Sequence, residues 1–384
     1  MLILDQNTLE KYCQSIKAPY ITIDTEFLRD KTYYPKLCLI QVSGPGLEPV
    51  AIDPLAEDID LAPLVAILED TSITKVFHSG RQDLEIFYTV MDGKLPSPIF
   101  DTQVAASVLG YGDQVSYAAL VKQICDAEID KSNQFTDWAR RPLSQKQLSY
   151  ALSDVTYLCD VYEKLLKDLD KTGRGRWTAE EMKRLQDTGG FDIAPEDAWK
   201  RIKIRSKKKQ DLVTLQALAA WREEMAQQKD IPRGRILKDE ILAQLAMLKP
   251  SSENDLKSVR GLSDGYRKGR QAEIILDMVA KAKQNWKSSE IDLPKPRPKH
   301  DRDISAAMDM LKLLLKIKAS EASIAPKMLA TASDLEDIAL GHGDNLPVMK
   351  GWRKEIFGRD ALALLDGKIC LSLKGEKVKI ERSK

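Results

Sequence analysis

Several features that define large classes of protein are missing from this sequence of 384 residues. No apolar run approaches the roughly 18 residues that a membrane-spanning helix needs. The N-terminus has no basic segment ahead of an apolar one, so we expect no signal peptide. The five cysteines are scattered without a C-x-x-C pair, which argues against structural zinc and against a disulfide framework. We therefore expect a protein of the reducing cytoplasm.

The charge of the chain is unevenly distributed, although the net charge is only +1. Residues 1–170 contain 15 Lys and Arg against 26 Asp and Glu, whereas residues 171–384 contain 44 against 32. Hydrophobic residues make up 43% of a chain long enough for two or three domains. An acidic first half suggests metal chemistry, and a basic second half suggests contact with a polyanion. Compositional drift between domains is the alternative.

The first half predicts a mixed α/β sheet with helices on both faces. Three closely spaced strands begin it, as in an antiparallel meander. Asp101 is predicted to cap a helix that starts in the Phe100-Asp101-Thr102 segment. The predicted strands are 20–26, 37–42, 49–53 and 74–78, and the predicted helices are 61–68, one from 83, one after 101, 116–126 and 144–170.

The second half is predicted to be helical, because strand patterns nearly vanish from residue 211 until 369–373. The Thr178-Ala179-Glu180-Glu181 segment has the pattern of a capping box, which predicts a helix beginning there. Seven of the ten residues from 200 to 209 are basic, as in a linker or an exposed helix face. Three prolines between residues 287 and 300 exclude a helix and indicate an interdomain linker.

Two segments of the second half look like copies of one diverged repeat. Residues 231–246 and 324–339 have equal length, and each is followed by a basic residue and a glycine, Arg260-Gly261 and Lys350-Gly351. The spacing of about 90 residues predicts two small helical domains rather than a solenoid. Chance similarity is the alternative.

Paired carboxylates stand out in the first half. Asp24 and Glu26 lie two apart in the strand 20–26 and therefore share a face. Two close carboxylates repel each other unless a cation lies between them, and oxygen ligands suit Mg²⁺. Asp83 follows a strand-to-helix transition, and Tyr150 and Asp154 lie four apart on one helix face. Taken alone, Asp24 and Glu26 could mark the solvated end of their strand. Asp83 could be a partner of the helix dipole, and Tyr150 with Asp154 a surface contact.

In this order the five residues resemble the DEDD superfamily of 3′–5′ exonucleases. Asp24 and Glu26 match its first motif, Asp83 its second, and Tyr150 with Asp154 its third, in the tyrosine-bearing subclass. The sister subclass carries a histidine where this chain has Ser149. Residues 23–27, 38–41, 76–79 and 100–103 narrow the resemblance to the ribonuclease D family, and the helical repeats resemble the HRDC (helicase-and-RNase-D C-terminal) domain.

The resemblance implies a ribonuclease H-like α/β exonuclease domain followed by two small all-α HRDC-like domains. The expected parts are an exonuclease domain at 1–170, a helical basic connector at 171–210, a first HRDC domain at 211–288, a Pro-rich linker at 289–300 and a second, diverged HRDC-like domain at 301–384.

The resemblance also implies an activity, a 3′–5′ exoribonuclease that trims tRNA precursors and other structured RNAs and releases nucleoside 5′-monophosphates. Asp24, Glu26, Asp83 and Asp154 would hold two Mg²⁺ or Mn²⁺ ions about 4 Å apart. Tyr150 would aim the attacking water, because its phenol normally titrates near pH 10 and is a poor base. We expect RNA as the partner, with no membrane and no obligate protein partner. A 3′–5′ DNA exonuclease and a non-catalytic nucleic-acid-binding protein remain alternatives.

Other side chains are weaker candidates for substrate binding. Phe27 and Leu28 follow the first motif and could contact the terminal base, or belong to the core. Gln41 could bind substrate or backbone, and His78 could bind substrate, although a structural hydrogen bond is the more common role. Three aromatic residues could stack on bases or fill the core, namely Tyr33, Tyr34 and Trp138.

Overall fold

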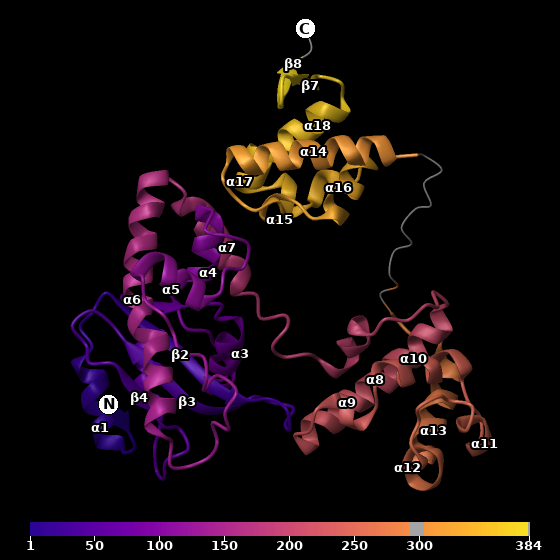
Figure 1. The fold of residues 1–384 in the computed structure, drawn as a ribbon. Helices are drawn as coiled ribbons and strands as arrows, with labels where there is room; N and C mark the ends of the chain where they lie inside the picture. The colour runs from indigo at the N-terminus through magenta and orange to yellow at the C-terminus, as the bar shows by residue number, and fades with distance from the viewer. Residues whose placement is uncertain (292, 294–302, 383–384) are drawn as a thin grey trace. The chain divides into compact units, whose positions relative to one another are not determined.

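The alternating apolar segments of the first hundred residues form one six-stranded sheet in the computed structural model (Figure 1). The strand order is β1-β4-β3-β2-β5-β6. β5 lies parallel to β2 and β6, whereas β3 and β4 are antiparallel, so the predicted mixed sheet is confirmed. The strands are β1 Leu2–Ile3, β2 Tyr20–Leu28, β3 Lys36–Ser43, β4 Val50–Ile52, β5 Thr74–Phe77 and β6 Ile99–Asp101.

The helix α6 crosses the sheet and contacts both β4 and β5 (Figure 1). Its first turn is closed by a capping box in which Ser144 and Gln147 bond reciprocally. It ends at Gly173, whose φ of 68° suits a residue without a Cβ. Between these caps, buried residues at helical spacing, such as Leu158 and Leu165, face the sheet and the helices α4 and α5. The helices of this region are α1 Gln6–Ser15, α2 Ala62–Glu69, α3 Arg81–Val90, α4 Thr102–Leu109, α5 Tyr117–Cys125 and α6 Gln145–Thr172.

The structure describes residues 1–291, 293 and 303–382, and they divide into two compact units. One unit contains Met1–Glu26, Leu37–Asp187 and the C-terminal region from 303 to 382. The other contains the segment Phe27–Lys36 and the helices that follow Thr188. The strand β2 therefore leaves the first unit between Glu26 and Phe27. None of the helices in the described part of the chain is long and apolar enough to cross a membrane.

The helices after Thr188 surround a core of their own. Leu215, Leu218 and Leu242 are fully buried there, with α8 packed against η1, α10 and α13. The basic segment at 200–209 is mostly the connection that leads into α8. The elements are η1 Pro195–Arg201, α8 Lys209–Lys229, α9 Arg233–Ile236, α10 Asp239–Leu248, α11 Glu253–Leu256, α12 Asp264–Arg267 and α13 Gly269–Asn285.

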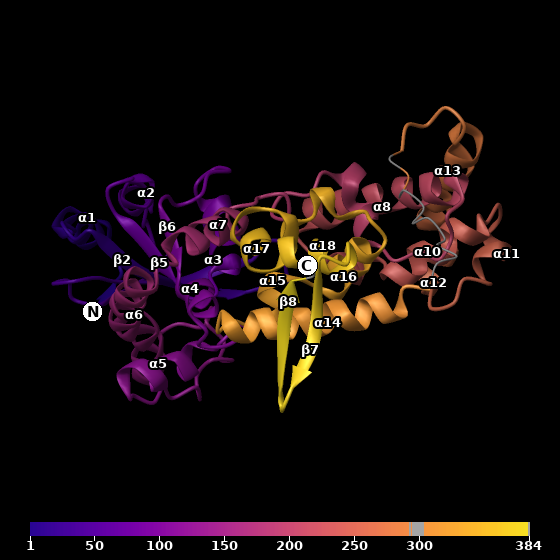
Figure 2. The same cartoon turned by 90° about the horizontal axis from the view of Figure 1, so that it is seen from above.

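The C-terminal region is a second helical core that ends in an antiparallel hairpin of β7 and β8 (Figure 2). The first strand was predicted. β8 was not, although Val378 and Ile380 alternate in it with charged residues. Pro294, Pro296 and Pro298 of the predicted linker lie outside the described residues. The elements are α14 Ser305–Glu321, α15 Pro326–Leu329, α16 Ala332–Ala339, η2 Gly343–Asn345, η3 Pro347–Met349, α17 Gly351–Arg353, η4 Lys354–Gly358, α18 Arg359–Leu365, β7 Ile369–Lys374 and β8 Lys377–Arg382.

The two segments of the predicted repeat have the same local structure. Residues 231–246 contain the four-residue helix α9 and most of α10, and residues 324–339 contain the four-residue helix α15 and then α16. The glycines that follow, Gly261 and Gly351, both have a positive φ, of 80° and 50°. This agreement favours a structural repeat over chance similarity.

The helix predicted to begin at Thr178 begins earlier, so this prediction is wrong. The helix α7 spans Gly175–Leu185, with Arg174 at its N-cap position. Thr178 lies inside the helix, where its hydroxyl donates to the carbonyl of Arg174 at 3.3 Å. The hydroxyl therefore bonds back to the preceding turn, as threonine inside a helix does, instead of capping an N-terminus.

Candidate active site

Three of the predicted carboxylates converge beside the second half of β2. One carboxylate oxygen each from Asp24, Glu26 and Asp154 lie within 4.8 Å of one another, and all three residues are partly buried. The two acids of β2 share a face because strand side chains alternate. Asp154 reaches them from α6, which packs across the sheet. The sheet and this helix therefore bring together residues 128 positions or more apart in sequence.

Asp83 lies beside this group, in the first turn of α3. It is 7% exposed, and its carboxylate accepts a hydrogen bond from the hydroxyl of Thr25, the residue between the two acids of β2. Its charge is close enough to raise the pKa of Asp24 and of Glu26. Sequence reasoning missed Thr25, because nothing in a D-T-E segment distinguishes an orienting threonine from a strand-forming one.

The crowding of these acids shifts their titration strongly. Burial raises the pKa of Glu26 to about 9, and repulsion from Asp154 and Asp83 adds to it. Burial raises the pKa of Asp154 to about 7 and that of Asp83 to about 6, although hydrogen bonds from Tyr150 and Thr25 respectively oppose the two shifts. The pKa of Asp24 lies well above its usual range, first through burial and then through repulsion by its three neighbours. Protein groups alone therefore leave the negative charge uncompensated.

The donor set fits hard divalent cations. Carboxylate oxygens are the ligands that Mg²⁺ and Mn²⁺ prefer, and bound cations invert the local pKa shifts by compensating the charge. The cluster of Asp24, Glu26 and Asp154 is therefore a candidate site for divalent metal ions.

Tyr150 lies one turn before Asp154 on the same face of α6. Its ring centroid is 6.2 Å from that of Trp138, with an interplanar angle of 33°. Burial raises the pKa of the Tyr150 phenol above its ordinary value, and repulsion from Asp154, Glu26 and Asp24 raises it further. The phenol is therefore protonated at neutral pH and can donate a hydrogen bond.

The other candidates are distributed differently. Phe27 and Leu28 follow Glu26 at the end of β2 and are partly exposed, so a substrate contact stays a prediction. Gln41 is fully buried, and its amide has no hydrogen-bond partner among the described residues. The two ring nitrogens of His78 lie 2.9 Å from the hydroxyl of Thr102 and 3.2 Å from the carbonyl of Val115, which favours the structural role.

The aromatic candidates differ in burial, and Tyr34 is 45% exposed, so its contact with a base stays a prediction. Trp138 is only 2% exposed, so its assignment to the core is confirmed. Tyr33 packs against the helical core of the second unit and donates to Glu223 at 2.6 Å. Tyr117, which sequence reasoning missed, donates to the carbonyl of Ser153 at 3.0 Å. The charges of Asp154 and Asp24 add to the effect of burial in raising its pKa.

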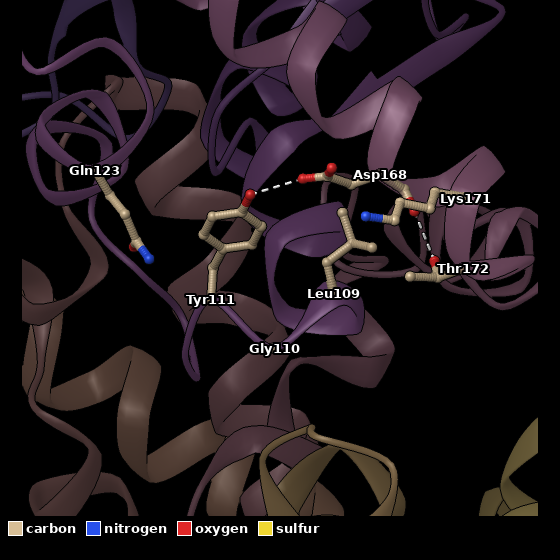
Figure 3. Close-up of a pocket in the computed structure, with 7 residues that line it drawn as sticks. All are labelled: Leu109, Gly110, Tyr111, Gln123, Asp168, Lys171 and Thr172. Carbon is tan, nitrogen blue, oxygen red and sulfur yellow. Dashed lines mark hydrogen bonds between the residues drawn. The ribbon is translucent and has the colours of Figure 1, made fainter.

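A pocket elsewhere in the same unit is separate from the acids (Figure 3). It has a volume of about 400 Å³. Within it Tyr111 donates to Asp168 at 2.7 Å, and Asp168 lies fourteen residues beyond Asp154 on α6, roughly 21 Å along the helix axis. The pocket therefore plays no part in the acidic site. Its lining residues are Leu109, Gly110, Tyr111, Gln123, Asp168, Lys171 and Thr172.

Comparison with known proteins places this arrangement in a class and a family. Residues 1–170 match the family model described as a 3′–5′ exonuclease, and residues 211–279 match that of the HRDC domain. Together with the mixed sheet and its acidic cluster, these matches define a 3′–5′ exonuclease domain joined to an HRDC domain.

Full-length relatives make the assignment specific. Ribonuclease D of Jannaschia sp. (strain CCS1) is 47% identical, over 98% of this chain and 98% of that protein. Ribonuclease D of Sphingobium indicum is 43% identical, over 100% and 98%. The crystal structure of Escherichia coli RNase D, described as an exoribonuclease involved in structured RNA processing, has a TM-score of 0.83 at 31% identity and covers 96% of this chain and 98% of that one. The chain belongs to the ribonuclease D family.

Proposed function

We propose that this 3′–5′ exoribonuclease of the ribonuclease D family trims the 3′ ends of tRNA precursors and other structured RNAs. Hydrolysis of the terminal phosphodiester would release a nucleoside 5′-monophosphate at each step. The observation that carries the proposal is the convergence of Asp24, Glu26 and Asp154 beside β2, with Asp83 next to them.

Two divalent ions, Mg²⁺ or Mn²⁺, are proposed as cofactors, held by Asp24, Glu26, Asp83 and Asp154. When bound, they supply the Lewis acidity and positive charge that phosphodiester hydrolysis needs. The four carboxylates bind in their ionised form. Tyr150 keeps its proton, because its pKa is raised, and its hydroxyl orients the attacking water by a hydrogen bond.

Substrate contacts are proposed from position and charge. Phe27 and Leu28 directly follow the acids of β2 and are partly exposed, so they are the candidates for packing against the terminal base. Gln41 and His78 are the weaker candidates, because the first is fully buried and both nitrogens of the second have protein partners. The connector at 171–210, with 12 Lys and Arg against 6 Asp and Glu, is suited to bind RNA phosphates.

We keep the five-part division of the chain as a proposal. The family matches at 1–170 and 211–279 support the exonuclease domain and the first HRDC domain. The repeated local structure supports a second, diverged HRDC-like domain at 301–384. A cytoplasmic location, with RNA but no obligate protein partner, stays a prediction from the sequence.

The substitution Asp24→Asn tests the activity. With Mg²⁺ and a 3′-extended tRNA precursor, we expect the rate of nucleotide release to fall on the order of 100-fold or more, because the site loses a charged ligand. Asp160→Asn is the matched control, since Asp160 lies exposed on α6 outside the acidic cluster. Undiminished trimming by Asp24→Asn would refute the proposed site.

A DNA substrate with the same 3′ sequence separates the alternatives. The relatives named above favour RNA, so we expect the RNA to be trimmed faster. Equal rates on both would replace the proposal with a general 3′–5′ exonuclease. RNA binding without nucleotide release under Mg²⁺ and Mn²⁺ would favour the non-catalytic alternative.

A further inference from the structure

A buried ion pair joins the C-terminal helical region to α7. Arg353 of α17 and Glu181 of α7 are 8% and 9% exposed. Two guanidinium nitrogens donate to the two carboxylate oxygens, the Nη2–Oε2 pair at 2.8 Å. The indole of Trp352 donates to the same carboxylate at 3.2 Å. Because a buried charge without its partner is unfavourable, this pair defines the docking of the C-terminal region on α7.

Aromatic and backbone contacts extend the same interface. Trp177 of α7 stacks on Trp352, with ring centroids 4.7 Å apart and an interplanar angle of 12°. The guanidinium of Arg174 lies 5.0 Å from the ring of Trp177. It donates to the carbonyl of Val108 at 2.8 Å and to that of Ala322 at 2.6 Å. One arginine thus bonds both the exonuclease domain and the C-terminal region.

The end of α7 is held by the helix that carries Asp83. Arg81, the first residue of α3, donates from one guanidinium nitrogen to the carbonyls of Leu185 and Asp187, the first at 2.8 Å. Asp83 lies two residues further along, in the same turn of α3. A shift of α7 therefore acts on the turn from which Asp83 reaches the other acids.

A second contact joins α7 to the loop before α3. The sulfur of Met182 accepts the backbone N–H of Asp101 at 3.2 Å. The carboxylate of Asp101 in turn accepts the backbone N–H groups of Gly80, at 2.8 Å, and Ser79, at 3.2 Å. Ser79 has a φ of 58°, so this loop adopts a conformation that needs its surroundings to hold it.

We propose that the C-terminal helical region is a positioning element of the exonuclease site. Arg353 and Trp352, acting through Glu181, hold α7 and thereby the α3 turn that presents Asp83. The composition of the C-terminal region agrees with this role. Residues 301–384 contain 15 Lys and Arg against 13 Asp and Glu, so they carry little net positive charge for binding phosphates. The inference rests on the proposed function and gives this region a role other than binding RNA.

The test measures Mn²⁺ binding to the full chain by titration calorimetry, together with kcat and KM on a short single-stranded RNA. Arg353→Met is expected to weaken Mn²⁺ binding roughly tenfold, as loss of groups that support metal ligands does. It should lower kcat and leave KM for RNA unchanged. The double variant Glu181→Leu with Arg353→Met replaces the pair by apolar side chains and is expected to recover Mn²⁺ binding to within about threefold of wild type.

Arg222→Met is the matched control. Arg222 is another buried arginine, 1% exposed, and it pairs with Asp239 in the other unit. The Arg222→Met variant is expected to leave Mn²⁺ binding unchanged. If Arg353→Met fails to fold, the Trp352→Phe variant provides the test. It keeps an aromatic ring, removes the donor to Glu181 and reduces the stack on Trp177, and a two- to threefold weakening of Mn²⁺ binding is expected.

Two results would overturn the inference. Wild-type Mn²⁺ binding in the folded Arg353→Met or Trp352→Phe variant would remove the coupling, and a raised KM for RNA at unchanged kcat would make the region an RNA-binding module. Failure of the wild-type chain to bind Mn²⁺ or to release nucleotides would instead refute the proposed function itself.

Discussion

At the scale of single residues, the candidate site is defined by acids whose pKa values are raised. Burial raises the pKa of Glu26 from 4.5 to about 9, that of Asp154 from 3.8 to about 7 and that of Asp83 from 3.8 to about 6. The folded, metal-free protein therefore binds protons that the unfolded chain has already released. The stability from these groups is highest below about pH 4 and is lost as the pH rises toward 9.

This linkage predicts how pH and metal act on thermal stability. With EDTA, we expect the Tm to fall between pH 6 and pH 8.5, because deprotonation turns on the repulsion among the acids. Mg²⁺ should raise the Tm more at pH 8.5 than at pH 6, since bound cations compensate that charge. Differential scanning calorimetry measures both effects.

The double variant Asp24→Asn with Glu26→Gln provides the control for this prediction. It should have a flatter dependence of Tm on pH and a smaller response to Mg²⁺ than the wild type. Identical pH slopes in the variant and the wild type would show that titration elsewhere in the chain controls the stability.

At the scale of elements, the caps and strands with local sequence patterns could be predicted. Asp101 accepts the N–H groups of Gln103 and Val104, as a helix N-cap does. The strand β2 follows from its β-branched alternation. The strands β1 and β6 have only two and three residues, too few for a pattern, and their pairing depends on β4 and β5. The start of α7 at Gly175 was also missed, because Arg174 at its N-cap position makes no side-chain capping bond that a sequence pattern would indicate.

The helix α6 shows how an element places the site. Ser144 and Gln147 close its first turn, with the Gln147 N–H donating to the serine hydroxyl oxygen at 3.2 Å. Tyr150 lies only one turn later, so the cap limits fraying close to the acids.

The substitution Ser144→Ala should therefore loosen the start of α6. Loss of an N-cap costs about 1 kcal/mol, which corresponds to about fivefold faster amide exchange in the turns up to Tyr150. Ser116→Ala removes the cap of α5 and should leave α6 exchange unchanged. Hydrogen exchange with mass spectrometry distinguishes the two, and unaltered exchange at the start of α6 in Ser144→Ala would contradict the prediction.

At the scale of the whole molecule, long-range assignments could not be predicted from sequence. The five motif residues were identified because their order and types are distinctive. Nothing local indicated that the loop at 27–36 belongs with the first HRDC domain, or that the C-terminal region belongs with the exonuclease domain. Both associations depend on contacts between residues more than 100 positions apart, such as Glu181 with Arg353. The periodicity of helices and strands does not predict such pairs.

The segment Phe27–Lys36 follows Asp24 and Glu26 in the chain and belongs to the helical unit. Asp230, which ends α8, accepts the backbone N–H groups of Tyr33 and Tyr34 at 3.0 and 3.1 Å. Because β2 leaves one unit and enters the other between Glu26 and Phe27, this anchor lies a few residues beyond the acids. The segment Phe27–Lys36 thus joins the strand that carries Asp24 and Glu26 to the helical unit along the chain.

The substitution Asp230→Gly tests the anchor without straining the chain, because Asp230 has a φ of 46° that glycine adopts readily. Loss of the acceptor should speed exchange of the Tyr33 and Tyr34 amides by about fivefold, as expected from a hydrogen bond worth about 1 kcal/mol. Asp126→Gly is the matched control, because Asp126 ends α5 with a φ of 51° and accepts a hydrogen bond from Lys122 instead. Wild-type exchange at both tyrosines in Asp230→Gly would mean that Tyr33 is held by its bond to Glu223 instead, and that the backbone anchor does not hold this segment.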